Sequence, residues 1–477
     1  MNKARIQRII LAIFIGAMGA SFATSSASYG QSKPLSSWQQ LARDIFEELI
    51  NINTTDSRGS TTKAAEAMAA RLKPAGFLPE DVQVLGPNSR KKNLVARLHG
   101  TGAHKPMLLL AHLDVVEAHR EDWTFDPFKF FEKDGYFYGR GTTDDKAMAA
   151  IWIANLVRFK QEGFKPGRDI IVALTADEES GNNNGVKWLL QNQRQMVDAE
   201  DCFNEGGGGL IKNGKYLLNE VQASEKLYLS FNLEVKNRGG HSSLPTRDNA
   251  IYHLAEGLTR LAHFDFTVHF DEITRTYFER SAALESGQSA ADMKAVTLTP
   301  PDSAAVARLS QISYYNALMR TTCVATRLAG GHADNALPQT ARAVVNCRIL
   351  PGESPDEVEK TLIRVLADKQ IAVTRIAEPT PSSASPLKPE IMRPIEQITT
   401  QMWPGVPVIP TMSTGATDGL YLRNAGIPTY GVSGLFEDID DFRAHGKDER
   451  IGVKSFFEAQ EFLYRLVKAV SSSDRTS

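Results

Sequence analysis

Histidine and acidic side chains follow several apolar runs in this 477-residue chain. The apolar run 108–111 leads directly into His112 and, after one intervening residue, Asp114. Such a run predicts a buried strand, and ligands bind at the carboxyl ends of parallel strands. A carboxylate this close to an imidazole can accept its second N–H and fix the tautomer of a metal-binding histidine. A surface His-x-Asp turn explains the motif equally well when it is taken alone.

A glycine-rich stretch at 139–146 opens a predicted helix that begins near Asp145. One of the two acids Asp144 and Asp145 can bridge two cations while the other caps the helix N-terminus, where negative charge is favoured. Capping by both acids is the alternative. A phosphate loop is disfavoured, because the stretch lacks the P-loop spacing and carries acids where a phosphate would lie.

Three consecutive acids, Asp177, Glu178 and Glu179, follow the apolar run 170–174. Unpaired buried carboxylates destabilise a fold, so three of them at a strand end favour a nearby cation or water. Adjacent side chains diverge, so Glu179 can bind a metal while Glu178 faces a water. A solvated acidic turn is the alternative.

Two further candidates stand alone in the sequence. Glu205 precedes four glycines, which also fit a plain flexible loop, and His445 lies between alanine and glycine near the C-terminus. Taken with the acids and histidine above, they provide the mixed nitrogen and oxygen donors that zinc accepts. Five ligands, one of them shared, suit two ions about 3.5–4 Å apart.

The predicted elements indicate two domains. Strands alternate with helices up to about residue 225, which predicts a layered α/β domain with a largely parallel sheet. From residue 226 the pattern changes to alternating strands and two helices, as in a small α+β sheet with both helices on one face. The later residues return to the first style. We therefore expect a discontinuous first domain, 36–225 and 389–470, and an inserted domain, 226–380.

Composition excludes several classes of partner. The chain has 56 acidic and 54 basic residues and no long run of either sign, so nothing favours nucleic acid or an anionic membrane surface. A small molecule or short peptide is the expected partner. The three cysteines match no zinc ribbon, and an odd count is no full disulfide framework, so we interpret them as small buried residues.

The N-terminus resembles a cleavable signal peptide, residues 1–27. Basic residues precede the apolar stretch 9–17, and small residues follow up to Ala27. An uncleaved anchor is the rival interpretation, but the stretch is shorter than the roughly 20 residues of a spanning helix. We expect a periplasmic or secreted protein that has no membrane segment after cleavage.

Six segments, in order and approximate spacing, resemble the dizinc metallopeptidase family of glutamate carboxypeptidase, aminoacylase, carnosinase and succinyl-diaminopimelate desuccinylase. They span nearly all of the mature chain: His112-Leu113-Asp114, 139–146, Asp177-Glu178-Glu179, Asn204-Glu205-Gly206, Gly239-Gly240-His241-Ser242 and Ala444-His445-Gly446. The resemblance implies a zinc-dependent exopeptidase-like α/β domain with an inserted α+β lid, through which many members form homodimers. Ala147 replaces a glycine of many members, and 269–313 enlarges the lid.

The resemblance also implies a role for each ligand. Two zinc ions, with cobalt or manganese as alternatives, would be held by five residues: His112 and Glu205 on one ion, Glu179 and His445 on the other, and Asp144 between them.

Three catalytic roles follow from the same resemblance. Asp114 would orient His112, and Glu178 would act as the general base that later protonates the departing amine. His241, from the lid, would donate to the developing oxyanion. Capping of a turn is the alternative for His241.

Four residues resemble the family's substrate-binding positions: Asn335, Arg348, Ser413 and Gly415. Arginine offers the planar pair of donors that a carboxylate prefers. A structural salt bridge is the alternative for Arg348. The expected substrate is a small peptide or N-acyl amino acid with a free carboxylate beside the cleaved amide. The rival readings are an aminopeptidase of the same dizinc type and a non-catalytic binding protein on this fold.

Overall fold

The computed structural model describes residues 34–380 and 382–472, and within them the chain divides into two compact units. The first unit runs to residue 221 and takes in 388–408 and the chain from 431 onward. The second unit comprises 222–387 and 409–430. We expected 409–430 to belong to the first domain, whereas this segment groups with the second unit. The expected signal peptide lies outside the described residues.

A mixed sheet forms the framework of the first unit, with the strand order β1-β2-β6-β3-β7-β17-β9-β8-β18 and β16 beside β9. Strand β3 pairs in parallel with both β6 and β7, whereas β2 pairs antiparallel with β1 and β6. Every residue of β3 and β6 is buried, as expected for strands covered on both faces. The predicted α/β class is confirmed, and the sheet, predicted to be mixed and largely parallel, is mixed with both parallel and antiparallel pairs.

The strands of this sheet are β1 (Val82–Leu85), β2 (Asn93–Leu98), β3 (Met107–His112), β6 (Ile170–Thr175), β7 (Asp201–Asn204), β8 (Gly209–Lys212), β9 (Lys215–Glu225), β16 (Val408–Ser413), β17 (Thr429–Gly431) and β18 (Phe436–Asp438). The chain passes between the two units along β9, β16 and β17. A separate small sheet has the order β19-β5-β4 and contains β4 (Phe131–Lys133), β5 (Tyr136–Tyr138) and β19 (Arg450–Gly452).

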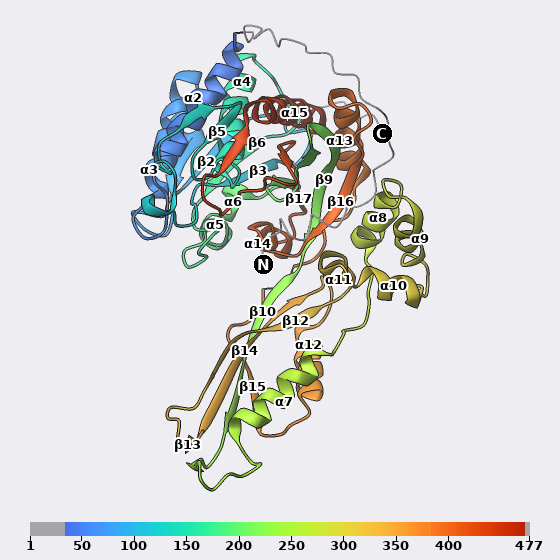
Figure 1. The fold of residues 1–477 in the computed structure, drawn as a ribbon. Coiled ribbons are helices and arrows are strands. Elements are labelled where there is room, and N and C mark those ends of the chain that lie inside the picture. The colour runs from blue at the N-terminus through green and yellow to red at the C-terminus, as the bar shows by residue number, and fades with distance from the viewer. Residues whose placement is uncertain (1–33, 381, 473–477) are drawn as a thin grey trace, which may run out of the picture. The chain divides into compact units, whose positions relative to one another are not determined.

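Helices cover the first unit's sheet (Figure 1). Helix α2 begins with a capping box, in which Ser36 Oγ accepts the Gln39 N–H and the Gln39 side chain accepts the Ser36 N–H. Helix α4 is buried on nearly every side, because it packs on β3 and β6 and also contacts α2 and α15. The helices are α2 (Ser37–Asn51), α3 (Thr61–Leu72), α4 (Lys146–Gln161), α5 (Gly185–Asn192), α6 (Arg194–Val197), α13 (Pro389–Met402) and α15 (Val453–Ser471).

The second unit is built on an antiparallel sheet with the order β12-β14-β10-β15. Alternate residues of β10, among them Leu229, Phe231 and Leu233, enter a core shared with α7 and α12. Two helices therefore lie on one face of this sheet, as predicted (Figure 1). The strands are β10 (Leu227–Lys236), β12 (Thr322–Gly330), β14 (Thr340–Ile349) and β15 (Ile371–Arg375), and β11 (Gly240–His241) pairs separately with β13 (Ala336–Leu337).

The enlargement of the lid at 269–313 is helical in the structure. The second unit's helices are α7 (Ala250–Ala262), α8 (Glu272–Ser281), α9 (Gly287–Ala295), α10 (Ser303–Leu309), α11 (Ser313–Met319), α12 (Pro355–Leu366) and α14 (Gly419–Asn424).

Two of the three cysteines form a disulfide, which corrects the interpretation of all three as small buried residues. Cys323 on β12 and Cys347 on β14 occupy directly opposed positions of neighbouring strands, and their sulfur atoms are bonded. Cys202 lies outside this disulfide and is buried, as expected. The sequence separation of 24 gave no sign of this pairing, because strand register is decided by the sheet.

Candidate metal centre

Three neighbouring strands bring three of the five candidate ligands to one edge of the first unit's sheet. His112 is the last residue of β3 and lies beside Thr175, the last residue of the parallel strand β6. Glu179 follows β6 by four residues, and Glu205 follows directly after β7. The carboxyl ends of parallel strands meet at the same edge, so side chains distant in sequence converge there.

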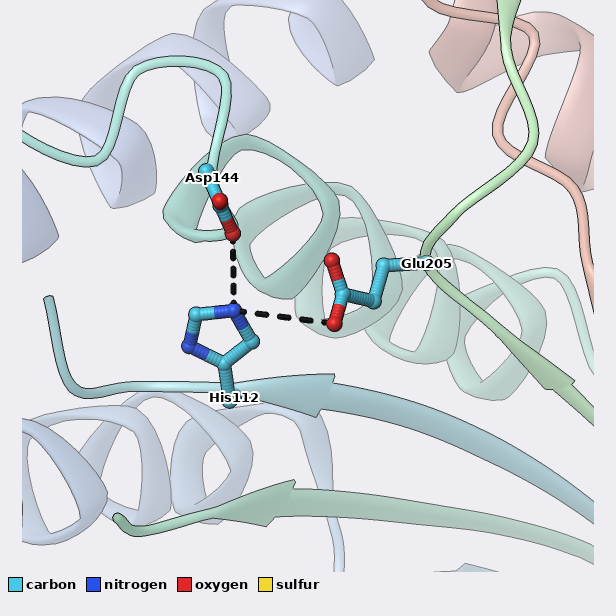
Figure 2. Close-up of side chains that lie close together, drawn as sticks. All are labelled: His112, Asp144 and Glu205. Carbon is cyan, nitrogen blue, oxygen red and sulfur yellow. Dashed lines mark hydrogen bonds and ion pairs between the residues drawn. The ribbon is translucent and has the colours of Figure 1, made fainter. Parts of the chain in front are cut away.

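The first ligand group consists of His112, Asp144 and Glu205 (Figure 2). His112 Nε2 lies 2.8 Å from Asp144 Oδ1 and 3.9 Å from Glu205 Oε1. The three ligand atoms lie within 4.8 Å of one another, and the imidazole is almost fully buried. One nitrogen and two carboxylate oxygens around a common point form a set that zinc accepts.

The second ligand group consists of Asp144, Glu179 and His445. His445 Nε2 lies 2.9 Å from Asp144 Oδ2 and 2.9 Å from Glu179 Oε1. Asp144 belongs to both groups and turns a different oxygen toward each histidine. A carboxylate shared in this way fits a pair of ions held a few ångströms apart, so the residues present suit a dinuclear centre.

Electrostatics in this cluster favour added positive charge. Burial alone would raise the pKa of Asp144, but hydrogen bonds from His112 and His445 outweigh it and lower the pKa. Burial, together with the charge of Asp144, raises the pKa of Glu205 well above its usual value. Hydrogen bonds to Asp144 and Glu179 raise the pKa of His445 to about 10. Carboxylates crowded in a buried site are stabilised by protons or cations, and a metal ion can replace those protons.

Asp114 holds the turn that carries Glu178 and Glu179. Its Oδ1 accepts the Glu178 N–H at 3.1 Å, and its Oδ2 accepts the Glu179 N–H at 3.0 Å. His112 Nδ1 is 2.9 Å from the main-chain oxygen of Asp114 but 3.8 Å from Oδ1. The backbone carbonyl is therefore the nearer partner for the imidazole, whereas the sequence assigned this role to the carboxylate.

Two neighbouring acids do not join either ligand group. The side chain of Asp145 makes no capping bond to α4, contrary to the prediction that the second acid of this pair caps the helix. Its Oδ2 instead accepts the His112 N–H at 3.3 Å. Asp177 is fully buried and forms an ion pair of 2.6 Å with Lys91. It is thereby neutralised without a metal, which the sequence could not show because Lys91 lies 86 residues away.

The remaining predicted site residues belong to the second unit. His241 on β11 pairs with Ala336 on β13, and Asn335 accepts the Ser242 N–H, so His241 and Asn335 are neighbours. His241 Nδ1 accepts the Ser243 N–H at 3.2 Å, which is the turn cap that the sequence offered as its alternative role.

The Arg348 guanidinium lies over the Tyr228 ring at 4.7 Å, and the Ser413 hydroxyl accepts the Gly415 N–H at 3.0 Å. Across the described ranges, no carboxylate lies within ion-pair distance of Arg348, so a structural salt bridge does not explain it.

Sequence reasoning missed one buried acid beside the ligands. Glu449, fully buried, accepts hydrogen bonds from the loop that carries Asp144. The available signal was its place four residues after His445, in a segment that also contains Lys447 and Asp448. Charged residues there look like an exposed loop, and only the tertiary structure buries one of them.

The chain is similar to a known protein family and to several known proteins. A family model described as peptidase family M20/M25/M40 matches residues 108–469. The chain is 31% identical to a probable carboxypeptidase S-like 2 of Dictyostelium discoideum, over 76% of this chain and 71% of the relative. It is 30% identical to the human N-fatty-acyl-amino acid synthase/hydrolase PM20D1, over 76% of this chain and 74% of the relative.

Solved structures share the fold. The M20 family metallo-carboxypeptidase Sso-CP2 of Sulfolobus solfataricus superposes with a TM-score of 0.66 at 17% identity, covering 90% of this chain and 99% of the other. Human carnosine dipeptidase 1 superposes with a TM-score of 0.59 at 16% identity, covering 91% of this chain and 96% of the other.

Proposed function

Because the chain belongs to peptidase family M20/M25/M40 and is thereby a hydrolase, we propose that it cleaves the amide bond of a small peptide or N-acyl amino acid. The substrate carries a free carboxylate beside that bond, so the activity is of the carboxypeptidase, dipeptidase or aminoacylase type. The observation that carries the proposal is Asp144, which turns one oxygen to each of two ligand groups.

The proposed centre would hold two zinc ions. His112 and Glu205 would hold one ion, Glu179 and His445 would hold the other, and Asp144 would be shared between them. When bound, the ions supply Lewis acidity that polarises the scissile carbonyl and makes a neighbouring water more acidic.

The chain's own residues handle the protons. Glu178, partly buried and held at its N–H by Asp114, takes the proton of the attacking water and passes it to the departing amine nitrogen. His241 Nδ1 accepts the Ser243 N–H, which leaves Nε2 as the ring nitrogen that can donate. That Nε2–H donates to the carbonyl oxygen as negative charge develops there.

Arg348 supplies the recognition of the free carboxylate. It carries no carboxylate partner among the described residues, and burial lowers the pKa of its guanidinium. A partly buried cation that has an aromatic ring but no carboxylate beside it favours an anionic ligand. Asn335, Ser413 and Gly415 complete the proposed substrate-binding set.

The names of the relatives support this substrate class. One relative is named a carboxypeptidase and another acts, by its name, on N-fatty-acyl amino acids. Both names describe an amide bond to an amino acid that keeps its carboxylate. For this chain we therefore expect N-blocked substrates to be cleaved, whereas an aminopeptidase requires a free amine.

The test is zinc content together with a substrate panel. Mature protein should contain two zinc ions per chain and release free amino acid from N-acyl amino acids and N-blocked peptides. Glu178→Gln should keep both ions and lose at least about 100-fold in kcat. The exposed Glu80→Gln serves as the matched control with unchanged kcat. Cleavage of only free-amine substrates would favour an aminopeptidase or a dipeptidase over a carboxypeptidase or aminoacylase. A chain that binds no zinc and cleaves nothing would favour a binding protein.

We also propose export and a lid dimer. The Cys323–Cys347 disulfide fits an oxidising compartment such as the periplasm or the medium. No helix in the described parts of the chain is both long and apolar enough to cross a membrane. The edge strand β12 exposes Val324 and Leu328, which favours contact with a second copy. Cell fractionation and sedimentation of the purified protein test these two expectations.

A further inference from the structure

Two ligand-bearing loops leave the same end of one strand pair in the first unit. Strand β5 pairs with β19, with Tyr138 opposite Arg450. The loop with Asp144 follows β5, and the loop with His445 precedes β19. The Gly139 N–H donates to the Glu449 main-chain oxygen at 3.2 Å and extends the ladder by one bond. Asp144 and His445 therefore lie on loops that start from the same end of this strand pair.

The Glu449 side chain binds the first of these loops along its length. Its Oε1 accepts from the Thr143 N–H at 2.8 Å, the Thr143 hydroxyl at 2.9 Å and the Asp144 N–H at 3.3 Å. Its Oε2 accepts from the Gly141 N–H at 3.1 Å. Gly141 has a φ of +90°, a conformation that favours glycine and turns this N–H toward the carboxylate.

Arg140 connects the same carboxylate to the second loop. Its Nη1 forms an ion pair of 2.6 Å with Glu449 Oε2, and its Nη2 lies 3.5 Å from the His445 main-chain oxygen. The guanidinium also lies over the Trp123 ring at 4.9 Å. Both Glu449 and Arg140 are buried, so this charged pair is screened little by solvent.

We propose that Glu449 and Arg140 are positioning residues, which fix the separation of Asp144 from His445 and thereby the affinity for the ion shared by Asp144, Glu179 and His445. This inference rests on the dinuclear centre proposed above. Two of that ion's three ligands belong to loops held by the pair. Groups that orient ligands in this way typically contribute about 10–100-fold to metal affinity.

Three variants test the pair at different strengths. Glu449→Gln keeps the size of the side chain, but glutamine has only one acceptor oxygen. That oxygen cannot accept from both Thr143 and Arg140. Thr143→Val removes one hydroxyl donor and little else. Arg140→Lys keeps the charge but loses the planar fork that faces both Glu449 and His445.

A control variant separates positioning from stability. Glu225, fully buried in the second unit, pairs with Arg423 at 2.7 Å and accepts from both the N–H and the hydroxyl of Thr417. It reproduces the chemistry of Glu449, but none of the five candidate ligands lies in its unit. Glu225→Gln should lower the melting temperature and leave zinc affinity unchanged.

The experiment is a zinc titration of metal-free protein against a chromogenic chelator, with melting curves recorded in parallel. We expect Glu449→Gln to weaken one of the two ions by about 10–100-fold, with Arg140→Lys and Thr143→Val weakening the same ion less. Excess zinc should restore much of the activity of Glu449→Gln with little change in KM. Folded variants that bind both ions with wild-type affinity would overturn the inference. If Glu449→Gln does not fold, wild-type affinity in both Arg140→Lys and Thr143→Val would overturn it. A wild-type chain without two zinc sites would instead refute the proposed function.

Discussion

Replacing Asp114 by asparagine tests whether one buried carboxylate organises the turn of Glu178 and Glu179. Each carboxylate oxygen accepts one main-chain N–H of that turn, at 3.1 and 3.0 Å, and the side chain is almost fully buried. Asparagine has nearly the same shape but only one acceptor oxygen. Its amide N–H₂ then faces an N–H donor, so one hydrogen bond is lost and one buried donor is left unpaired.

The expected cost follows from these two bonds. A hydrogen bond to a charged acceptor contributes about 1.5–3 kcal/mol, and an unpaired buried donor costs about 1–3 kcal/mol. Burial raises the pKa of Asp114, against the charge of His112 and the two N–H groups, so the ionised side chain carries a desolvation cost that asparagine avoids. We therefore expect a net loss of about 1–3 kcal/mol in the free energy of unfolding.

The functional effect should exceed the effect on stability. A turn that shifts by an ångström displaces both the general base and a metal ligand, and such a shift can cost about 100-fold in rate. Urea unfolding with a chelator present measures the stability of the metal-free chain, and kcat at saturating zinc measures the catalytic effect.

Asp169→Asn is the matched control for this variant. Asp169 Oδ1 accepts the Gly100 N–H at 2.8 Å, but the residue precedes β6, whereas Glu178 and Glu179 follow that strand. The control should lose stability and keep its kcat. Wild-type kcat in Asp114→Asn, or equal loss of kcat in both variants, would refute the reasoning.

Further predictions concern metal, pH and the disulfide. Removing zinc with a chelator should lower the free energy of unfolding by about 2.7 kcal/mol for each ion that had been present at 100 times its Kd, which melting curves at graded zinc concentrations measure. The raised pKa values of His112 and His445, the latter about 10, mean that zinc must displace protons, so titrations should show affinity falling as pH falls. In the metal-free chain the shift of His445 stabilises the fold fully below about pH 6.5, and that stability is lost as pH rises through about 10, as urea unfolding across pH should show. Replacing Cys323 and Cys347 with alanine opens a link across 24 residues and should cost about 3 kcal/mol in the second unit, measured by unfolding with and without reductant.

Local sequence patterns were sufficient to predict the fold class and the family, and both predictions are confirmed. The apolar runs 108–111 and 170–174 are long enough to identify buried strands without knowledge of their neighbours. Residues that directly follow such strands share one sheet edge, because parallel strands align their carboxyl ends. His112 and the acids after residue 176 could therefore be proposed as partners from sequence alone.

The sequence could not determine what depends on register and on distant partners. Asp177 and Glu179 are the same kind of residue two positions apart, yet one pairs with Lys91 and the other faces His445. The Cys323–Cys347 bond depends on which strands become neighbours and in what register. These choices are made by side chains that lie far apart along the chain.

The sequence by itself determined which residues could bind metal, because donor type and placement after buried strands are local properties. Only the tertiary structure decided that Asp144 turns one oxygen toward each histidine and that Glu449 is buried beneath its loop. Both facts require loops some 300 residues apart in sequence to leave the same end of one strand pair. The physical reason is that burial and coordination geometry arise from packing between segments that are distant in sequence. The pattern of neighbouring residues carries no information about that packing.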